Sequence, residues 1–208
     1  KGLEDEALKE IDKTIAAYGD DGYNATETWH LQKVAILEKR NDKVGLIEEY
    51  RRLFRQHLVD KRTYFEKLKE LVDKEDWDEF VVKLFEDIPH ITDDDCILVC
   101  DMIVEEKKFS CLMKILMDNV MSFSRVQLFK KYAPYMSEED QATYTNHVIE
   151  ELRMHLSYAK SKSYGYIVDD IKGMYTCCEV SKKLILDFVE EIECNYGNRP
   201  ALMRLLRS

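Results

Sequence analysis

Apolar residues recur every three or four positions along most of the chain, which is the spacing of one face of an α-helix. In the first segment Leu3, Leu8, Ile11 and Ile15 share such a face, with polar residues between them. No segment has the strict alternation of a half-buried strand. The pattern predicts helices over residues 3–18, 26–40, 42–58, 60–73, 75–88, 93–107, 109–120, 124–133, 137–160, 163–176, 179–196 and 199–207.

Capping signals support several of these helix starts. A hydroxyl side chain followed three residues later by an acidic or amide side chain forms a capping box, which satisfies the free amides of a first turn. Pro200 stands where a first helical residue is expected. Short connections favour antiparallel neighbours, so we expect an all-α stack of antiparallel helical hairpins. The capping pairs are Thr92 with Asp95, Ser124 with Gln127, and Ser137 with Asp140.

One apolar triplet has counterparts elsewhere in the chain. In KEDWDEFVVKLFEDI, Trp77 is followed by Phe80 and Leu84, and the same offsets start at Lys43, Phe109 and Tyr164. The steps between these starts are 34, 32 and 55 residues, and steps near 34 are typical of tetratricopeptide-like (TPR-like) hairpins. The long step indicates an atypical or fused unit over 124–160.

These steps favour a TPR-like α-solenoid as the arrangement of the helices. We expect a single helical-repeat domain over residues 1–208, with possible sub-units 1–120 and 121–208. The alternative is an irregular helical bundle, because apolar offsets at helical spacing also recur by chance.

The composition agrees with helices joined by short loops, because the 208 residues include only 7 glycines and 3 prolines. The net charge of −10 disfavours direct binding of a nucleic-acid backbone by this segment. No apolar run reaches about 18 residues, so we expect no membrane span. The charged opening KGLEDEALKE does not have the pattern of a signal peptide.

The six cysteines suit buried helix positions better than a disulfide framework. Cys96 and Cys100 stand one helical turn apart among apolar residues, as small hydrophobic side chains would. The adjacent Cys177 and Cys178 are expected at a helix end. Disulfide or metal roles are the alternative, and reduced cysteines favour a cytoplasmic location. The remaining two are Cys111 and Cys194.

Three residues on one predicted helix have the side chains of a metal site. His147, Glu151 and His155 lie at i, i+4 and i+8, so neighbouring pairs could share an ion, whereas the outer two are about 12 Å apart. A zinc site would need ligands from another helix, and the sequence indicates none. The acidic clusters stand at helix starts or on solvated faces, and no glycine-rich phosphate loop or nucleophile elbow is present. We therefore expect no enzyme, no cofactor and no metal.

The strongest local positive charge comes from Arg51, Arg52 and Arg55. A favourable i, i+4 pair of Glu48 with Arg52 offsets part of it. This cluster is either a solvated face or a partner-binding patch. Further basic residues nearby are Lys39, Arg40, Lys61 and Arg62.

The last fifty residues contain Lys162, Tyr164, Ile167 and Ile171, and then Tyr196, Arg199, Ala201, Leu202, Leu205 and Leu206. This pattern resembles the helical tail that follows the zinc-binding module in bacterial SWIM-type zinc finger proteins. The chain lacks the Cys-x-Cys and Cys-x-His pairs of that module, so no zinc is carried over. The resemblance implies an interaction role, which makes Tyr164, Tyr196 and Arg199 candidate partner-binding residues. The alternative is structural: the tyrosines seal hairpin interfaces and Arg199 caps the preceding helix.

These observations favour a non-catalytic helical-repeat scaffold that binds a protein partner of unknown identity. The chain opens with Lys1 and not with Met, so we expect a segment of a larger protein. The alternative function is an accessory segment of a nucleic-acid-associated zinc finger protein, for which a contiguous basic face around Arg51, Arg52 and Arg55 would be the sign.

Overall fold

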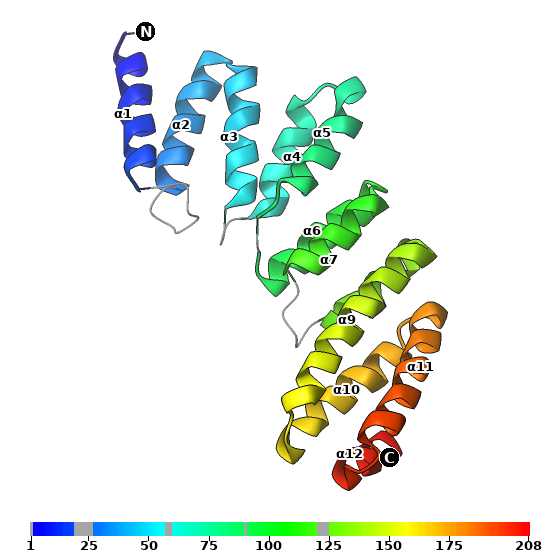
Figure 1. Cartoon of the computed structure of the whole chain (residues 1–208). Helices are drawn as coiled ribbons and strands as arrows, with labels where there is room; N and C mark the ends of the chain where they lie inside the picture. The colour runs from blue at the N-terminus through cyan, green and yellow to red at the C-terminus, as the bar shows by residue number, and fades with distance from the viewer. Residues whose placement is uncertain (1, 19–26, 57–59, 90, 120–124) are drawn as a thin grey trace. The chain divides into compact units, whose positions relative to one another are not determined.

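The computed structural model describes residues 2–18, 27–56, 60–89, 91–119 and 125–208 (Figure 1). This part of the chain is helical and contains no strand, which confirms the all-α prediction. Each predicted helix is present, and the ends that were predicted within the described residues lie within about three residues of those expected. The α-helices are α1 (Gly2–Tyr18), α2 (Glu27–Arg40), α3 (Lys43–Arg55), α4 (Lys61–Leu71), α5 (Lys74–Glu86), α6 (Asp93–Glu105), α7 (Leu112–Asn119), α8 (Arg125–Tyr132), α9 (Glu138–Tyr158), α10 (Tyr164–Tyr175), α11 (Glu179–Tyr196) and α12 (Pro200–Leu206). Short 3-10 turns cover Phe109–Cys111, Ala133–Tyr135 and Ser161–Ser163.

Two of the three predicted capping boxes can be compared with the structure. Ser137 Oγ accepts a hydrogen bond from the Asp140 amide at 3.1 Å and donates to the Asp140 carboxylate at 2.8 Å. Thr92 Oγ1 accepts from the Asp95 amide at 3.3 Å. Ser124 lies outside the described residues. These side chains satisfy amides that have no partner within the first helical turn.

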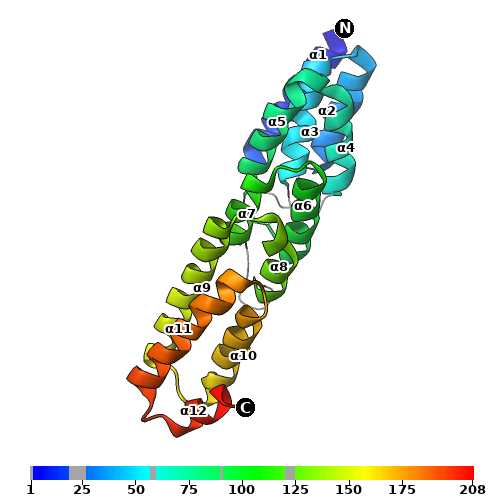
Figure 2. The same ribbon diagram turned by 90° about the vertical axis from the view of Figure 1, so that its right-hand side faces the viewer.

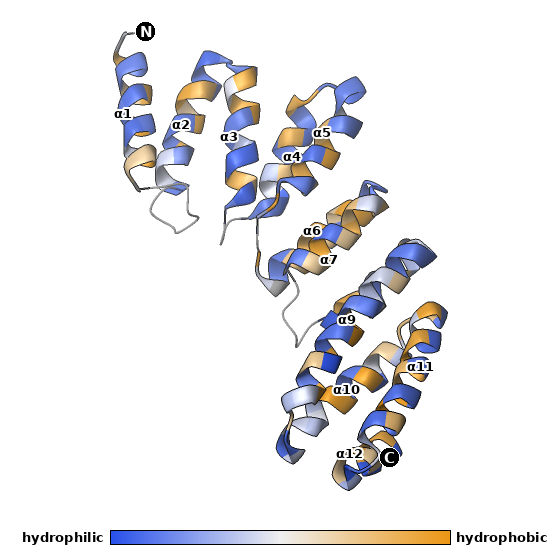
Figure 3. Ribbon diagram, viewed as in Figure 1, coloured by the Kyte–Doolittle hydropathy of each residue, from blue (hydrophilic) through white to orange (hydrophobic). Residues whose placement is uncertain are grey.

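The chain divides into two compact units, Lys1–Met102 and Ile103–Ser208, and the division falls inside α6. In the first unit α1 packs against α2, α2 against α3, and α3 against α4. Hydrophilic and hydrophobic residues are both present along the helices that are labelled in Figure 3. None of the helices in the described ranges is both long and apolar enough to cross a membrane.

Aromatic rings hold α3, α4 and α5 of the first unit together. The ring of Phe65 on α4 lies 5.5 Å from Trp77 and 5.8 Å from Phe85, both on α5, and 6.1 Å from Phe54 on α3. Trp77 is almost completely buried, and Leu84 is fully buried. The triplet that begins at Trp77 therefore contributes packing contacts between neighbouring helices.

A buried carboxylate connects α1, α2 and α3. Glu49 on α3 is 1% exposed, and it contacts His30 Nδ1 and lies 3.0 Å from Lys33 Nζ, both on α2. Lys33 Nζ also donates to Asp12 on α1 at 2.7 Å. Burial opposes the charge on Glu49, but the hydrogen bonds from His30 and Lys33 outweigh it and hold the pKa of Glu49 below its ordinary value.

A buried lysine stands at the start of α4. Lys61 is 0% exposed, and its ammonium donates to the carbonyl oxygens of Phe54 at 2.8 Å and Gln56 at 2.6 Å, at the end of α3. Asp95 of α6 is its nearest carboxylate, at 4.0 Å. Burial lowers the pKa of Lys61. The sequence places Lys61 near a basic cluster predicted as a solvated face or a partner-binding patch, and for Lys61 this prediction is wrong, because its side chain caps a helix end inside the core.

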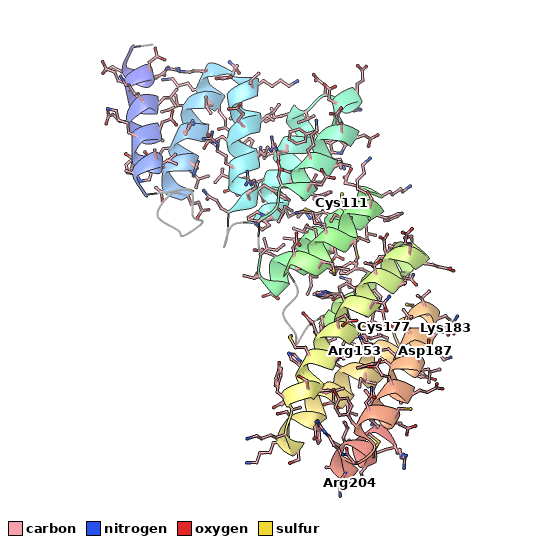
Figure 4. The ribbon with its side chains drawn as sticks, viewed as in Figure 1. Cys111, Arg153, Cys177, Lys183, Asp187 and Arg204 are labelled. Carbon is pink, nitrogen blue, oxygen red and sulfur yellow. The ribbon has the colours of Figure 1, made fainter. Side chains whose placement is uncertain are left out.

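The second unit has two layers, as Figure 2 shows: α7, α9 and α11 lie in one layer, and α8 and α10 lie in the other. Contacts join alternate helices in sequence, namely α7 with α9, α8 with α10, α9 with α11, and α10 with α12. Arg153 on α9 reaches α11, where its guanidinium donates to the two oxygens of Glu191 at 2.8 and 2.6 Å (Figure 4). This ion pair keeps the pKa of Glu191 low.

A glycine sets the close approach of α8 to α10. A Cβ atom at Gly173 would lie 2.5 Å from Cγ1 of Val126. Cys177, just after α10, also contacts the same residue, since its Sγ lies 3.6 Å from the Val126 carbonyl oxygen. Burial raises the pKa of this thiol to about 12, so it stays protonated at neutral pH.

The four sequence triplets fall on different helices. The first three start on α3, on α5 and at the 3-10 turn before α7, so steps near 34 correspond to every second helix. The fourth starts on α10, three helices after α7 and in the opposite layer of the second unit. The region 124–160 contains α8 and the long helix α9, which accounts for the long step.

The six cysteines differ in how far they are buried. Cys96, Cys100 and Cys111 are buried, as the sequence predicted. Cys177 and Cys178 are half-buried at the junction of α10 and α11, and Cys178 Sγ accepts from the Ser181 amide at 3.4 Å. Cys194 departs from the prediction of buried positions, because it is exposed.

Candidate interaction groove in the second unit

The α9–α10 hairpin and the first residue of α8 line a half-open groove of about 890 Å³. Ligand sites in proteins commonly occupy about 300–1,000 Å³, so the groove is large enough for several side chains. Its lining residues are Arg125, Leu152, His155, Tyr158, Ala159, Lys160, Lys162, Ser163, Tyr166, Ile167, Asp169 and Asp170.

The groove has an apolar floor and an aromatic rim. Leu152 of α9 and Ile167 of α10 line it although their side chains are buried, so they form its bottom. Tyr158 and Tyr166 are 64% and 73% exposed. Tyrosines that expose an apolar ring next to a hydroxyl are common where proteins bind partners.

One end of the groove contains a buried arginine. The Arg125 side chain is 5% exposed and pairs with Glu151 of α9 and with Asp170 of α10, the latter at 2.5 Å. Its Nε has no hydrogen-bond partner among the described residues. Two carboxylates therefore offset the guanidinium, and the neighbouring Asp169 adds a further negative charge to this end.

The other end is basic. Lys160 and Lys162 belong to the connection between α9 and α10, and both are exposed. Neither lysine forms an ion pair with any residue in the described ranges, and the same holds for Asp169. The free charges of the groove are thus positive at the hairpin turn and negative farther along α10.

The sequence-predicted residues Tyr164, Tyr196 and Arg199 meet next to this hairpin. The Arg199 guanidinium lies 4.5 Å from the ring of Tyr196, and its Nη1 donates to the Leu156 carbonyl at 2.9 Å and to the Tyr164 hydroxyl at 3.4 Å. Arg199 therefore caps the end of α9, whereas the sequence predicted a cap on the preceding helix, α11. All three side chains make internal contacts, and their partner-binding role stays a prediction.

The predicted basic cluster lies on α3 of the first unit. Arg51 pairs with Asp87, which follows α5. Arg52 and Arg55 are exposed and form no ion pair within the described part of the chain, so the predicted Glu48–Arg52 pair is not formed there. Of the neighbouring basic residues, Lys39 pairs with Glu4 at 2.6 Å and Arg40 pairs with Asp5 at 2.7 Å. Internal ion pairs neutralise much of the positive charge in this region.

The histidines of α9 have separate surroundings. His147 Nε2 lies 3.5 Å from Glu151, whose carboxylate also pairs with Arg125. His155 lines the groove and contacts the ring of Tyr158. Within the described ranges, no group of three or more His, Cys, Asp or Glu side chains is arranged to hold a metal ion.

The groove was missed by sequence reasoning, although a local signal was present. The segment YAKSKSYGY, residues 158–166, interleaves tyrosines with lysines in a short connection between two helices. Side chains in such a connection cannot all point into the core, so several of them had to be exposed together. Arg125 gave no comparable signal, because its two acidic partners are 26 and 45 residues away in the sequence.

Comparisons of the chain with protein-family models, with curated proteins and with solved structures found no match.

Proposed function

We propose that the chain is a non-catalytic helical-repeat scaffold that binds a protein partner in the groove of the second unit. The groove carries this proposal, because it combines an apolar floor, exposed tyrosines and unpaired charges at its two ends. Buried anchors in an apolar pocket, surrounded by aromatic and polar residues, are the usual chemistry of a protein interface.

The scaffold is proposed to be a TPR-like α-solenoid. The contacts between alternate helices in the second unit support this arrangement, since stacked hairpins bring every second helix together. Steps near 34 residues between the first three sequence triplets support it as well. The resemblance to the helical tail of SWIM-type zinc finger proteins agrees with such a role and is part of the proposal.

Photo-crosslinking tests the function. A benzoylphenylalanine placed at Tyr166, on the rim, should give a discrete adduct with a protein in an extract of the native host, and nuclease treatment should leave that adduct unchanged. The matched control is the same group at Tyr175, which is also exposed on α10 but does not line the groove. Equal labelling from both positions, or none from Tyr166, would contradict the proposal.

The alternative, an accessory segment of a nucleic-acid-binding protein, rests on Arg52 and Arg55. It is favoured less, because Arg51 is paired with Asp87 and the net charge is −10. The nuclease step separates the two functions, since an adduct lost on nuclease treatment would support the alternative.

A further inference from the structure

The free charges of the groove are ordered along the α9–α10 hairpin. Lys160 and Lys162 stand at the turn, just before α10 begins at Tyr164. Asp169 and the Arg125–Asp170 pair stand about six residues into that helix, which corresponds to roughly 9 Å along its axis. Leu152 and Ile167 form the apolar floor, and Ile167 stands between Lys162 and Asp169 along the chain.

The arginine at the acidic end is not available to attract an anion. Arg125 is almost completely buried and already contacts Glu151 and Asp170. Its charge is offset by these two carboxylates, and Asp169 remains exposed beside them. An incoming positive charge is therefore favoured at this end, and an incoming negative charge is favoured at the lysines.

We infer that the groove recognises a short linear segment of a partner protein in which an apolar anchor stands between an acidic and a basic side chain. The anchor fills the space above Leu152 and Ile167, between the rings of Tyr158 and Tyr166. The acidic side chain lies at Lys160 and Lys162, and the basic side chain lies at Asp169. This inference rests on the proposed function and adds the chemistry and the direction of the partner segment.

The size of the groove fits such a segment. An extended peptide advances about 3.3 Å per residue, so about three residues span the distance between the two charged ends. A volume of about 890 Å³ holds the anchor and parts of its neighbours. The order of charges also fixes direction, because a segment bound in reverse would place like charges together at both ends.

Selection from a phage library of random dodecapeptides tests the inference on the whole chain. We expect the enriched peptides to share one apolar or aromatic residue flanked by an acidic residue on one side and a basic residue on the other. The variant K160E/K162E should bind these peptides about ten-fold more weakly at low salt, with a smaller difference at high salt. The matched control K183E/R204E makes the same charge change at exposed positions on α11 and α12 outside the groove (Figure 4) and should bind as the parent does.

A variant with two basic ends tests the charge complementarity. D169K replaces the free negative charge of the acidic end at an exposed position, and circular dichroism checks that it remains folded. Selection against this variant should return peptides with acidic residues on both sides of the apolar anchor. Those peptides should bind the parent chain more weakly than the peptides selected on it, and an unchanged selection would contradict the inference.

Replacing the two rim tyrosines distinguishes a failure of this inference from a failure of the proposed function. Binding that is lost in Y158S/Y166S but kept in Y175S, with no preferred charge order, would overturn the inference and leave the docking function standing. Enriched peptides that ignore both the tyrosines and the lysines, or no enrichment at all, would overturn the two together.

Discussion

Glu49 is almost completely buried although carboxylates seldom occupy such positions without partners. Its two oxygens contact His30 and Lys33, and Lys33 extends the network to Asp12 on the first helix. The network joins three helices of the first unit through polar and charged side chains. Removing one member should therefore leave the others buried and incompletely paired.

Glu49→Gln tests this network. Because the pKa of Glu49 is held below its ordinary value of 4.5, the ionised carboxylate stabilises the fold above about pH 4.5, and this contribution is lost as the pH falls through the lowered pKa. We expect Glu49→Gln to lose about 3 kcal/mol at pH 7 and to lose less further stability on acidification than the parent. Urea unfolding between pH 3 and 7 measures both, and Glu48→Gln, at the exposed neighbouring position, should behave as the parent. Identical acid profiles for Glu49→Gln and the parent would contradict this account.

Lys61 differs from Glu49, because its charged form destabilises the fold. Burial lowers its pKa, so the charged form destabilises the fold at neutral pH, and this penalty is relieved as the pH rises through the lowered pKa toward 10.5. Lys61→Met removes the penalty together with the donors to the Phe54 and Gln56 carbonyls, and unpaired buried carbonyls cost about 2 kcal/mol.

We expect Lys61→Met to have a lower free energy of unfolding than the parent at pH 7. The difference between the two free energies should grow as the pH rises. Urea midpoints at pH 7, 8 and 9 measure this difference, and Lys67→Met, at an exposed position on the same helix, is the control. A difference in stability that shrinks as the pH rises would show that the Lys61 pKa is not lowered.

The burial of Glu49 and Lys61 could not be predicted from the sequence. Glu49 stands in IEEY and Lys61 in VDKRTY, segments that read as solvated and charged. Their burial depends on partners up to 34 positions away, such as Asp95 for Lys61. Spacing along one helix contains no information on such contacts, because they arise only when helices pack. The capping pairs, by contrast, were predictable, since donor and acceptor lie three residues apart.

At the scale of elements, helix positions followed from periodicity, because the 3.6-residue repeat decides which residues can share a buried face. The identity of the neighbouring helix did not follow, as Arg199 illustrates: it caps α9 and not the adjacent α11. The groove was also not predictable as a cavity, since it depends on Arg125 of α8 meeting Asp170 of α10.

Trp77 tests the aromatic contact between α4 and α5. Its ring meets Phe65 at 5.5 Å and is 9% exposed, so Trp77→Ala should leave a large cavity and lower the stability of the first unit by about 3–5 kcal/mol. Thermal unfolding followed by circular dichroism measures the loss. Phe80→Ala, on the same helix but only half-buried, should cost less. An unchanged midpoint for Trp77→Ala would mean that the indole is not part of the core.

Gly173 tests the contact of α8 with α10 in the second unit. Alanine is favoured over glycine in a helix by about 1 kcal/mol, but a Cβ here would lie 2.5 Å from Val126. We expect the clash to prevail and Gly173→Ala to destabilise by about 1–3 kcal/mol. The double variant Val126→Ala with Gly173→Ala should recover part of the loss, because it removes the methyl group that the new Cβ meets. A thermodynamic cycle of the four proteins by urea unfolding measures the coupling, and additive effects would contradict the proposed contact.

For the whole molecule, the division into two compact units has a direct consequence for unfolding. Each unit buries its own apolar residues, and both tryptophans, Trp29 and Trp77, belong to the first. Tryptophan fluorescence therefore reports on the first unit, whereas the helical circular dichroism signal reports on both. Leu152→Ala, at a fully buried position of the second unit, should lower the midpoint of a circular dichroism transition by an amount that corresponds to about 2–5 kcal/mol.

We expect the fluorescence midpoint of that variant to stay at the parent value, since repeat proteins distribute stability over neighbouring segments and need not unfold in one step. Glu49→Gln supplies the reciprocal case, because it should lower the fluorescence midpoint and leave the second-unit transition in place. Urea titrations that record both signals on one sample make the comparison. Coincident transitions that shift together in both variants would mean that the units unfold as one cooperative body, and the groove could then no longer be treated as a property of the second unit alone.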